Sequence, residues 1–262
     1  MKRKLPSLKD KLNEGKLTLG SWITIGHPIV AEVMAHSGFE WLTIDMEHSA
    51  ITLDVAQSLI KTIELNDCIP LVRVGENNPY LIKRVMDAGS HGVIVPMVNS
   101  RKDAENAVKA VKYPPKGSRG VGLARAQKYG FDFEGYKNWL EEDSVVIVQI
   151  EHVDAVKNLK EILTTDGVDG FIVGPYDISG SLGIPGDFED PRFKREIEQI
   201  MKVAKETKMT AGFHVIPPDA KEVERIINLG YRFVAISLDT LFLGTLCRNN
   251  INAISKRFQN IT

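Results

Sequence analysis

Two acidic side chains follow apolar runs that are typical of buried β-strands. Glu151 comes directly after VVIVQI, and Asp177 comes shortly after FIVG. Two carboxylates at close range repel each other, and a bound divalent cation removes that repulsion. Because no cysteine lies nearby, ligation by oxygen favours Mg²⁺ or Mn²⁺ over a structural zinc. The pair is therefore a candidate metal site; the alternative is that one carboxylate caps the following helix or pairs with an arginine.

A histidine and an arginine follow two earlier runs of the same kind. His48 closes the stretch DMEH, and its imidazole suits general acid–base work, with Asp45 near enough in sequence to orient it. The alternative for His48 is a hydrogen-bonded structural role. Arg73 lies at the end of the run PLVRV and offers a planar fork for a carboxylate or a developing enolate. The alternative for Arg73 is a buried ion pair with Asp45 or Glu47.

The elements that must position these residues alternate along the whole chain. Apolar, β-branched runs predict strands at 19–25, 41–45, 70–74, 92–98, 145–151, 170–174, 210–215 and 233–238. Amphipathic stretches predict helices at 28–37, 53–65, 79–88, 100–111, 153–163, 191–207, 218–229 and 241–258. Gly38, Gly89 and Gly230 are expected to end helices.

This alternation predicts a (β/α)8 barrel formed by the whole chain, residues 1–262, as one domain. Several strands are apolar throughout, as strands of a buried parallel sheet should be. A doubly wound open sheet is the alternative, but its G-x-G-x-x-G fingerprint is missing after the first strand. In a barrel the chemistry collects at the carboxyl ends of the strands, which is where the candidate residues stand.

Other residues narrow the chemistry. His91, His152 and His214 are weaker candidates, and His214 points either into the barrel mouth or into packing. No lysine stands at a strand end, so a Schiff-base aldolase is not expected. The segments 216–219 and 239–244 lack a glycine-rich phosphate cradle, which disfavours a phosphorylated substrate.

Composition excludes several classes of protein. Against 34 Asp and Glu there are 33 Lys and Arg, and a net charge of −1 is unlike that of a nucleic-acid-binding domain. The two cysteines, Cys68 and Cys247, cannot build a disulfide framework. The N-terminal stretch lacks the apolar core of a signal peptide, and no run is long enough to span a membrane. We expect a cytoplasmic protein whose partner is a small molecule rather than a nucleic acid or a membrane.

Six stretches together resemble the HpcH/HpaI aldolase family. They are GFEWLTIDMEHS, LVRV, GVIVPMVNS, YPPKGSRGVG, VQIE and GPYDISGSLGIPG, in order over roughly residues 18–240. The family has the (β/α)8 barrel of the phosphoenolpyruvate/pyruvate superfamily and includes 2-dehydro-3-deoxyglucarate and 2,4-dihydroxyhept-2-ene-1,7-dioate aldolases. Its members are metal-dependent class II aldolases that cleave 4-hydroxy-2-oxo acids to pyruvate and an aldehyde.

The resemblance implies a role for each candidate. Glu151 and Asp177 would hold Mg²⁺ or Mn²⁺, with Co²⁺ and Zn²⁺ as further choices, and the metal would stabilise the pyruvate enolate. Arg73 would hold the enolate oxygen, and Gln149 would support the metal or the substrate. His48 would transfer the proton of the 4-hydroxyl group, with Asp45 near it. Asp87 would be a partner for His48 across a subunit boundary. Backbone amides around Gly174, Pro175, Tyr176 and Asp177 would receive the pyruvate carboxylate.

Two residues depart from the family pattern. Tyr176 stands where members carry a small residue, and Met46 stands where they often have glycine. A tyrosine at the mouth would narrow or re-polarise the aldehyde pocket, so the resemblance supports the pyruvate half of the substrate better than the aldehyde half.

The family is typically a hexamer in which the last helix swaps onto a neighbouring barrel. Residues 241–258 carry enough apolar side chains to dock in this way, so a homo-oligomer is expected, and a hexamer by analogy. Packing of this helix on its own barrel is the alternative.

Two other functions fit the same residues. One is a carbon–carbon lyase or condensing enzyme acting on an acyl-CoA or on oxaloacetate at the same metal site. For CoA, the long link 113–144 supplies basic residues that would have to gather near the mouth: Lys116, Arg119, Arg125 and Lys128. The other is a non-catalytic ligand-binding barrel, for which a group of two carboxylates, an arginine and a histidine has no evident use.

Overall fold

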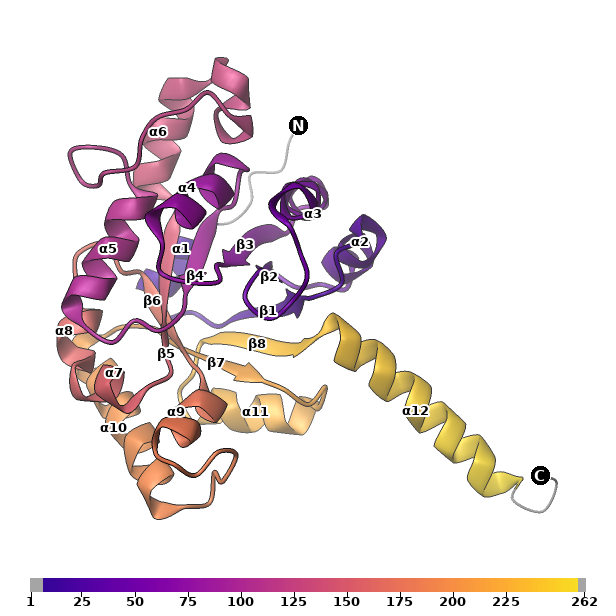
Figure 1. Cartoon of the computed structure of the whole chain (residues 1–262). Helices are drawn as coiled ribbons and strands as arrows, with labels where there is room; N and C mark the ends of the chain where they lie inside the picture. Colours follow the sequence, from indigo (N-terminus) through magenta and orange to yellow (C-terminus); the bar gives the residue numbers. More distant parts are fainter. Residues whose placement is uncertain (1–6, 259–262) are drawn as a thin grey trace.

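Eight parallel strands close into a barrel in the computed structural model, which describes residues 7–258 (Figure 1). Each strand pairs with the next one along the chain, and the last pairs with the first. The predicted barrel is confirmed, and the doubly wound sheet is excluded. The strands are β1 (Thr18–Ile23), β2 (Trp41–Asp45), β3 (Ile69–Arg73), β4 (Gly92–Val95), β5 (Val145–Ile150), β6 (Gly170–Val173), β7 (Ala211–Val215) and β8 (Phe233–Leu238).

Helices lie around the outside of the barrel, and the predicted ones are present within a few residues of their expected ends. The stretch 153–163 is divided into two short helices at Asn158. Gly38, Gly89 and Gly230 follow their helices with φ of 95°, 101° and 104°, the left-handed conformation expected of residues that end helices. The helices that follow predicted stretches are α2 (Pro28–His36), α3 (Leu53–Leu65), α4 (Pro79–Asp87), α5 (Arg101–Val111), α7 (Val153–Lys157), α8 (Leu159–Leu163), α10 (Pro191–Thr207), α11 (Ala220–Asn228) and α12 (Asp239–Arg257). Those not predicted are α1 (Leu8–Asn13), the 3-10 helix η1 (Arg125–Gly130), α6 (Phe133–Glu142) and α9 (Pro175–Ser181).

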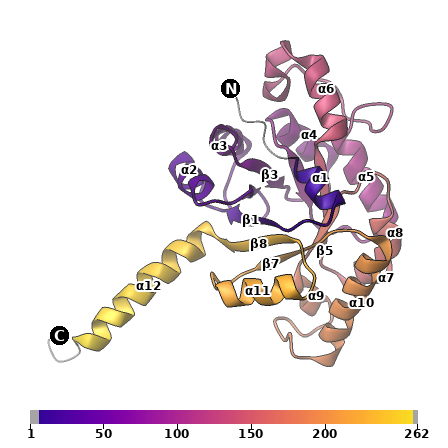
Figure 2. The same ribbon diagram turned by 180° about the vertical axis from the view of Figure 1, so that it is seen from behind.

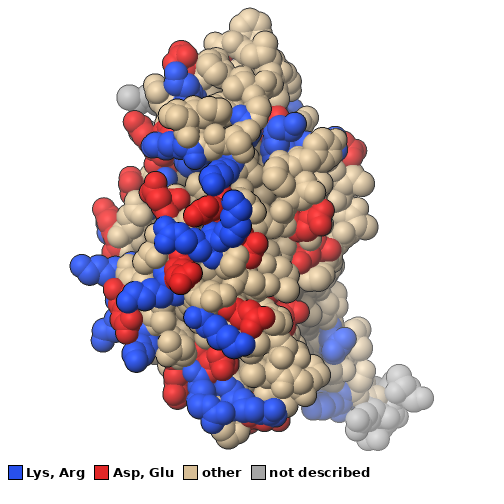
Figure 3. All heavy atoms as spheres, turned by 60° about the vertical axis from the view of Figure 1, so that its left-hand side comes forward, with Lys and Arg blue, Asp and Glu red and all other residues tan. Residues whose placement is uncertain are grey.

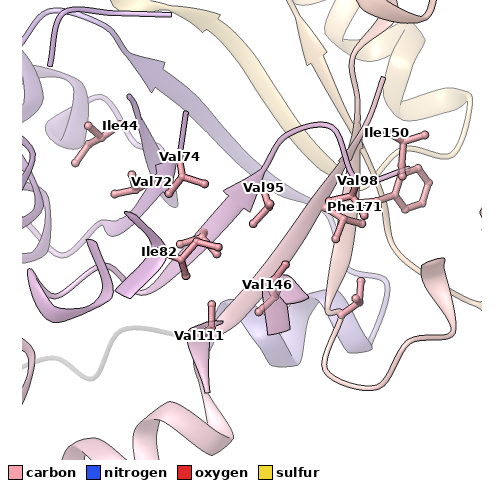
Figure 4. Close-up of a cluster of buried hydrophobic side chains, with 14 of the residues drawn as sticks. Ile44, Val72, Val74, Ile82, Val95, Val98, Val111, Val146, Ile150 and Phe171 are labelled. Atoms are coloured by element: carbon pink, nitrogen blue, oxygen red, sulfur yellow. The ribbon is translucent and has the colours of Figure 1, made fainter. Parts of the chain in front are cut away.

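Alternation along the strands divides the core into two layers. One set of side chains fills the barrel, where the rings of Trp41 and Phe233 stack with their centroids 4.1 Å apart. Gly20 is required beside them, because a Cβ there would lie 2.1 Å from Trp41 Cδ2. The other set packs against the helices, and Figure 4 shows part of it, including Ile44, Val72 and Val146. Side chains of the first set at the carboxyl ends of the strands therefore point into the mouth of the barrel.

The long link between β4 and β5 is folded onto the barrel. Arg119 is buried, with Nη2 2.8 Å from Asp87 Oδ1 and with the guanidinium carbon 4.7 Å from the ring centroid of Tyr113. The other basic residues of the link are also paired: Lys116 with Glu141, Arg125 with Glu64, and Lys128 with Asp132.

The prediction that these basic residues gather near the mouth is wrong for Arg125 and Lys128. Both line a cavity of about 1070 Å³ together with Ile69, His91 and Val145. Those three residues begin or precede strands, so the cavity lies at the end of the barrel opposite the candidate site. Two of the four basic residues that would have supported an acyl-CoA substrate therefore lie away from the mouth.

The last helix leaves the barrel. α12 projects away from the other elements in both ribbon views (Figures 1 and 2). Asp239 is buried at its start, where its carboxylate accepts hydrogen bonds from the backbone N–H groups of Thr24 at 2.9 Å and Ile25 at 2.8 Å. Farther along, four apolar side chains are more than half exposed: Leu243, Leu246, Ile251 and Ile254. Packing of α12 on its own barrel is therefore not what the structure shows.

The surface agrees with the near-neutral charge of the sequence. Figure 3 shows Lys and Arg interspersed with Asp and Glu over one face, without a field of a single sign. None of the helices within residues 7–258 has the length and hydropathy of a membrane span.

Candidate active site

The register of the barrel brings the predicted residues to one end of it. Asp45 lies opposite Arg73 in the pairing of β2 with β3. Gln149 and Glu151 share the parity of Val145 and Ile147, which fill the barrel from β5, so both are directed inward. Asp177 stands in the first turn of α9, directly after β6. The structure thus places these candidate residues together at the carboxyl ends of the strands.

Arg73 forms the ion pair that was its alternative interpretation. Its Nη2 lies 2.6 Å from Asp45 Oδ2 and its Nε lies 3.0 Å from Asp45 Oδ1, while Glu47 Oε2 is 3.3 Å from the same Nε. The indole ring of Trp22, on β1, lies against the guanidinium, 4.4 Å from Cζ to the ring centroid. These contacts fix the guanidinium in one plane at the mouth, where it is largely buried.

Asp45 holds the loop that carries His48 but does not touch its imidazole. Its Oδ1 accepts hydrogen bonds from the backbone N–H groups of Glu47 at 3.0 Å and His48 at 3.2 Å. Burial opposes ionisation of Asp45, but the hydrogen bonds and charge of Arg73 outweigh it, so the pKa of Asp45 lies below its usual value. The expected orientation of the imidazole by Asp45 is thus not seen.

The imidazole of His48 is 69% exposed, which also argues against a buried structural role. The carboxylate nearest to it is that of Glu47, with Oε2 3.8 Å from Nε2. In this chain Asp87 pairs with Arg119, and within residues 7–258 no ion pair joins Asp87 to His48.

Glu151 is buried and held by two donors. The backbone N–H of Met97 lies 2.6 Å from Oε1, and Gln149 Nε2 donates to Oε2. Burial raises the pKa of Glu151, and the negative charge of Asp177 raises it further. Within residues 7–258 neither Glu151 nor Asp177 forms an ion pair, and His152 rather than Glu151 caps α7. The start of α9 has no side-chain cap either, so neither carboxylate caps a helix or pairs with an arginine in the part of the chain that the structure describes.

A glycine keeps open the space that the two carboxylates share. A Cβ on Gly174 would lie 3.1 Å from Glu151 Oε2 and 3.6 Å from Asp177 Oδ2. The two oxygens therefore border the same small volume. Glu47 is influenced by Glu151 as well. Burial raises the pKa of Glu47, and the negative charge of Glu151 raises it further.

The donor set fits a divalent cation. Four carboxylates stand at the mouth, and two of them, those of Asp45 and Glu47, pair with the guanidinium of Arg73. The other two, those of Glu151 and Asp177, form no ion pair within residues 7–258. In the part of the chain that the structure describes, no three His, Cys, Asp or Glu side chains form a ready-made metal site. The protein would thus supply about two carboxylates, which is typical of Mg²⁺ sites that keep positions for water and substrate.

A cavity of about 560 Å³ opens beside these carboxylates, lined by Met97, Glu151, His152, Tyr176, Asp177, Gly180, Ser181, Pro185 and Gly186. Tyr176 is half exposed on its rim and packs edge-on against Phe188, with ring centroids 4.9 Å apart. The predicted amide cradle is smaller than expected. Gly174 N–H already donates to Ile150 O at 3.0 Å and Pro175 has no N–H, which leaves the first-turn amides of Tyr176 and Asp177.

His214 points into the mouth rather than into the packing behind β7. Its ring lies tilted against that of Trp22 with centroids 5.2 Å apart, and its Nε2 lies 2.9 Å from Ser237 O on β8. Burial lowers the pKa of His214 to about 4, and the neighbouring charge of Arg73 lowers it as well.

Two residues of the site lie outside the sequence prediction. Trp22 could have been predicted from the sequence, because it lies near the end of the first strand and points inward like Gly20. Met97 could not have been predicted. Its φ of 52° turns its N–H toward Glu151, and such a backbone conformation is not evident from residue type.

Comparison with known proteins identifies the family. The model of the HpcH/HpaI aldolase/citrate lyase family matches residues 18–244. The chain belongs to this family. It is therefore a lyase of the aldolase type, and the non-catalytic alternative is set aside.

Individual relatives cover nearly the whole chain. The hydroxypyruvate/pyruvate aldolase of Roseobacter denitrificans is 33% identical over 240 residues, covering 91% of this chain and 93% of that protein. The 2-keto-3-deoxy-L-rhamnonate aldolase of Klebsiella pneumoniae is 37% identical over 235 residues, covering 89% and 87%. A crystal structure of a family member from Burkholderia cenocepacia has a TM-score of 0.89 at 30% identity, covering 94% of this chain and 98% of that one.

Proposed function

We propose that this family member is a divalent-metal-dependent class II aldolase that reversibly cleaves a 4-hydroxy-2-oxo acid to pyruvate and an aldehyde. The observation that carries the proposal is the shared space between Glu151 and Asp177 at the mouth that also holds Arg73. The aldolase names of the relatives support the same reaction.

Glu151 and Asp177 would hold the cation, Mg²⁺ or Mn²⁺. Bound there, a divalent cation supplies Lewis-acid stabilisation of the negative charge that develops on a 2-oxo acid during cleavage. Gln149 and the N–H of Met97 keep the carboxylate of Glu151 in one orientation for this purpose.

Arg73 stabilises the enolate oxygen. Its guanidinium is fixed by Asp45, Glu47 and Trp22 before substrate arrives, so little reorganisation is needed when the charge develops. The N–H groups of Tyr176 and Asp177, at the start of α9, receive the pyruvate carboxylate.

His48 removes the proton of the 4-hydroxyl group as the bond between C3 and C4 breaks. Its exposed imidazole can accept that proton and return it to solvent. Asp87 supports His48 only if a neighbouring subunit brings it close, since in its own chain it is paired with Arg119.

We further propose that α12 docks on a neighbouring barrel in a homo-oligomer, a hexamer by analogy with the family. Its exposed apolar face supports this, because docking on another subunit would remove four large apolar side chains from water.

Proton exchange at the methyl group of pyruvate in D2O tests the function. The protein is stripped of metal with EDTA and assayed with and without added Mg²⁺ or Mn²⁺. Exchange that depends on the metal is the expected result, because it requires enolate formation. Absence of exchange with every metal would contradict a pyruvate aldolase and direct attention to an acyl-CoA or oxaloacetate substrate.

A further inference from the structure

The two ring nitrogens of His214 have different partners. Nε2 lies 2.9 Å from Ser237 O, and a backbone carbonyl can only accept a hydrogen bond. Nε2 must therefore carry the proton. Within residues 7–258 Nδ1 has no hydrogen-bond partner, and it is not among the enclosed polar atoms that lack one. Nδ1 is thus an accessible acceptor in a fixed position.

The position of this acceptor relates it to the reaction. The imidazole lies tilted against the indole of Trp22, and the guanidinium of Arg73 contacts the same indole. The charges of Arg73 and Asp45 act on the imidazole, so His214 belongs to the same mouth as the residues proposed for the reaction.

The chemistry of the acceptor selects its ligand. A carboxylate or phosphate offers no proton to Nδ1, and the only N–H of the ring is already given to Ser237 O. A hydroxyl or an ammonium group can donate to Nδ1. The 4-hydroxy-2-oxo acids of the proposed function carry hydroxyl groups, so a hydroxyl group is the donor that this acceptor would meet.

We propose that His214 is a specificity-determining residue whose Nδ1 accepts a hydrogen bond from a hydroxyl group of the substrate next to the reacting carbons. This inference rests on the proposed aldolase function and deepens it. The hydroxyl belongs either to C3 of the donor, as in hydroxypyruvate, or to C2 of the aldehyde, as in glycolaldehyde.

Two substitutions separate the two nitrogens. His214→Gln keeps an amide N–H near the position of Nε2, where it can still donate to Ser237 O, but removes the acceptor. His214→Asn places a carbonyl oxygen near the position of Nδ1 and so keeps an acceptor. The acceptor near the position of Nδ1 is therefore present in His214→Asn and absent in His214→Gln.

The test measures kcat/KM for condensation in all four pairings of pyruvate or hydroxypyruvate with acetaldehyde or glycolaldehyde. The wild type should favour one hydroxylated partner over its deoxy counterpart by about tenfold, the effect of one hydrogen bond. His214→Gln should lose this preference, so that its kcat/KM for the hydroxylated pair falls about tenfold relative to that for the deoxy pair, and His214→Asn should retain most of the preference. Whether the donor or the aldehyde series shows the effect identifies the hydroxyl.

Several outcomes would overturn the proposal. One is that the wild type turns over the substrates without a preference for a hydroxylated partner. Another is that His214→Gln loses the same activity in all four pairings. Calorimetric binding of the same four compounds, and ¹⁵N shifts that report the ring tautomer, do not need turnover. A wild type that turns over no pair but binds the hydroxylated compounds more tightly through His214 would contradict the aldolase function alone. Equal binding, or a proton on Nδ1, would contradict the role of His214.

Discussion

The guanidinium of Arg73 and the carboxylate of Asp45 meet side by side, with two N–H groups reaching two oxygens at 3.0 and 2.6 Å. The register of β2 and β3 places the residues opposite each other, so the pair is built into the sheet rather than formed by mobile loops. One edge of the guanidinium is occupied in this way. The pair holds the guanidinium in position to stabilise the negative charge that is proposed to develop on the substrate at the mouth.

Arg73→Lys should lower kcat/KM for aldol cleavage by about 10²- to 10³-fold, because a lysine cannot keep both the planar pair with Asp45 and the contact with the enolate. Steady-state kinetics on a 4-hydroxy-2-oxo acid measure the loss. Arg84→Lys, at an exposed position of α4, is a matched control that should leave kcat/KM unchanged. Wild-type turnover by Arg73→Lys would mean that Arg73 serves the fold alone.

Glu151→Gln and Asp177→Asn should each lower activity at least about a hundredfold and weaken Mn²⁺ binding. Both changes keep the shape of the side chain, so circular dichroism and the melting temperature should change little. Titration of each variant with Mn²⁺, followed by electron paramagnetic resonance, measures binding without reference to turnover. Full activity in both variants would remove the basis of the metal site.

His48→Ala should slow aldol cleavage by about 10²- to 10⁴-fold and leave pyruvate binding intact, since the imidazole is exposed and proposed only for proton transfer. Calorimetry with pyruvate and Mg²⁺ checks the second half of this expectation. If pyruvate binding disappears with the imidazole, His48 is a binding residue.

His214 should make stability depend on pH. Its pKa is about 4 in the folded protein and about 6.5 in an unfolded chain, so between these values only the unfolded state holds the proton. The free energy of unfolding therefore falls as pH drops from about 6.5 to about 4. Urea unfolding at several pH values should show a smaller fall for His214→Gln than for the wild type. Parallel curves for the two proteins would contradict the lowered pKa.

Leu246→Asp or Ile254→Asp should shift the protein toward smaller assemblies, because each places a charge on the apolar face of α12. Asn252→Asp adds the same charge on the opposite face of the helix and should leave the assembly unchanged. Light scattering coupled to gel filtration measures the mass in each case. A monomeric wild type would contradict the docking of α12 on a second copy.

Strand periodicity made most of the fold, and the placement of the main candidate residues, predictable. The order of apolar runs fixes the barrel, and the inward parity of Asp45, Arg73 and Glu151 follows from the same alternation. What the pattern could not supply is the pairing of groups that are distant in sequence. That Asp45 binds Arg73 instead of the imidazole of His48, and that the basic side chains of the long link pair with carboxylates away from the mouth, depends on three-dimensional contacts.

Asp239 has a mechanical consequence. Asp239 is the first residue of α12, and its carboxylate accepts hydrogen bonds from the backbone just after β1. The start of the helix is therefore held rigidly to the barrel and does not rotate freely. The direction in which α12 leaves is thus a property of the barrel itself. A helix with a fixed direction can contact a second copy over only a narrow range of angles. The geometry of any assembly is then determined by the structure of the single subunit.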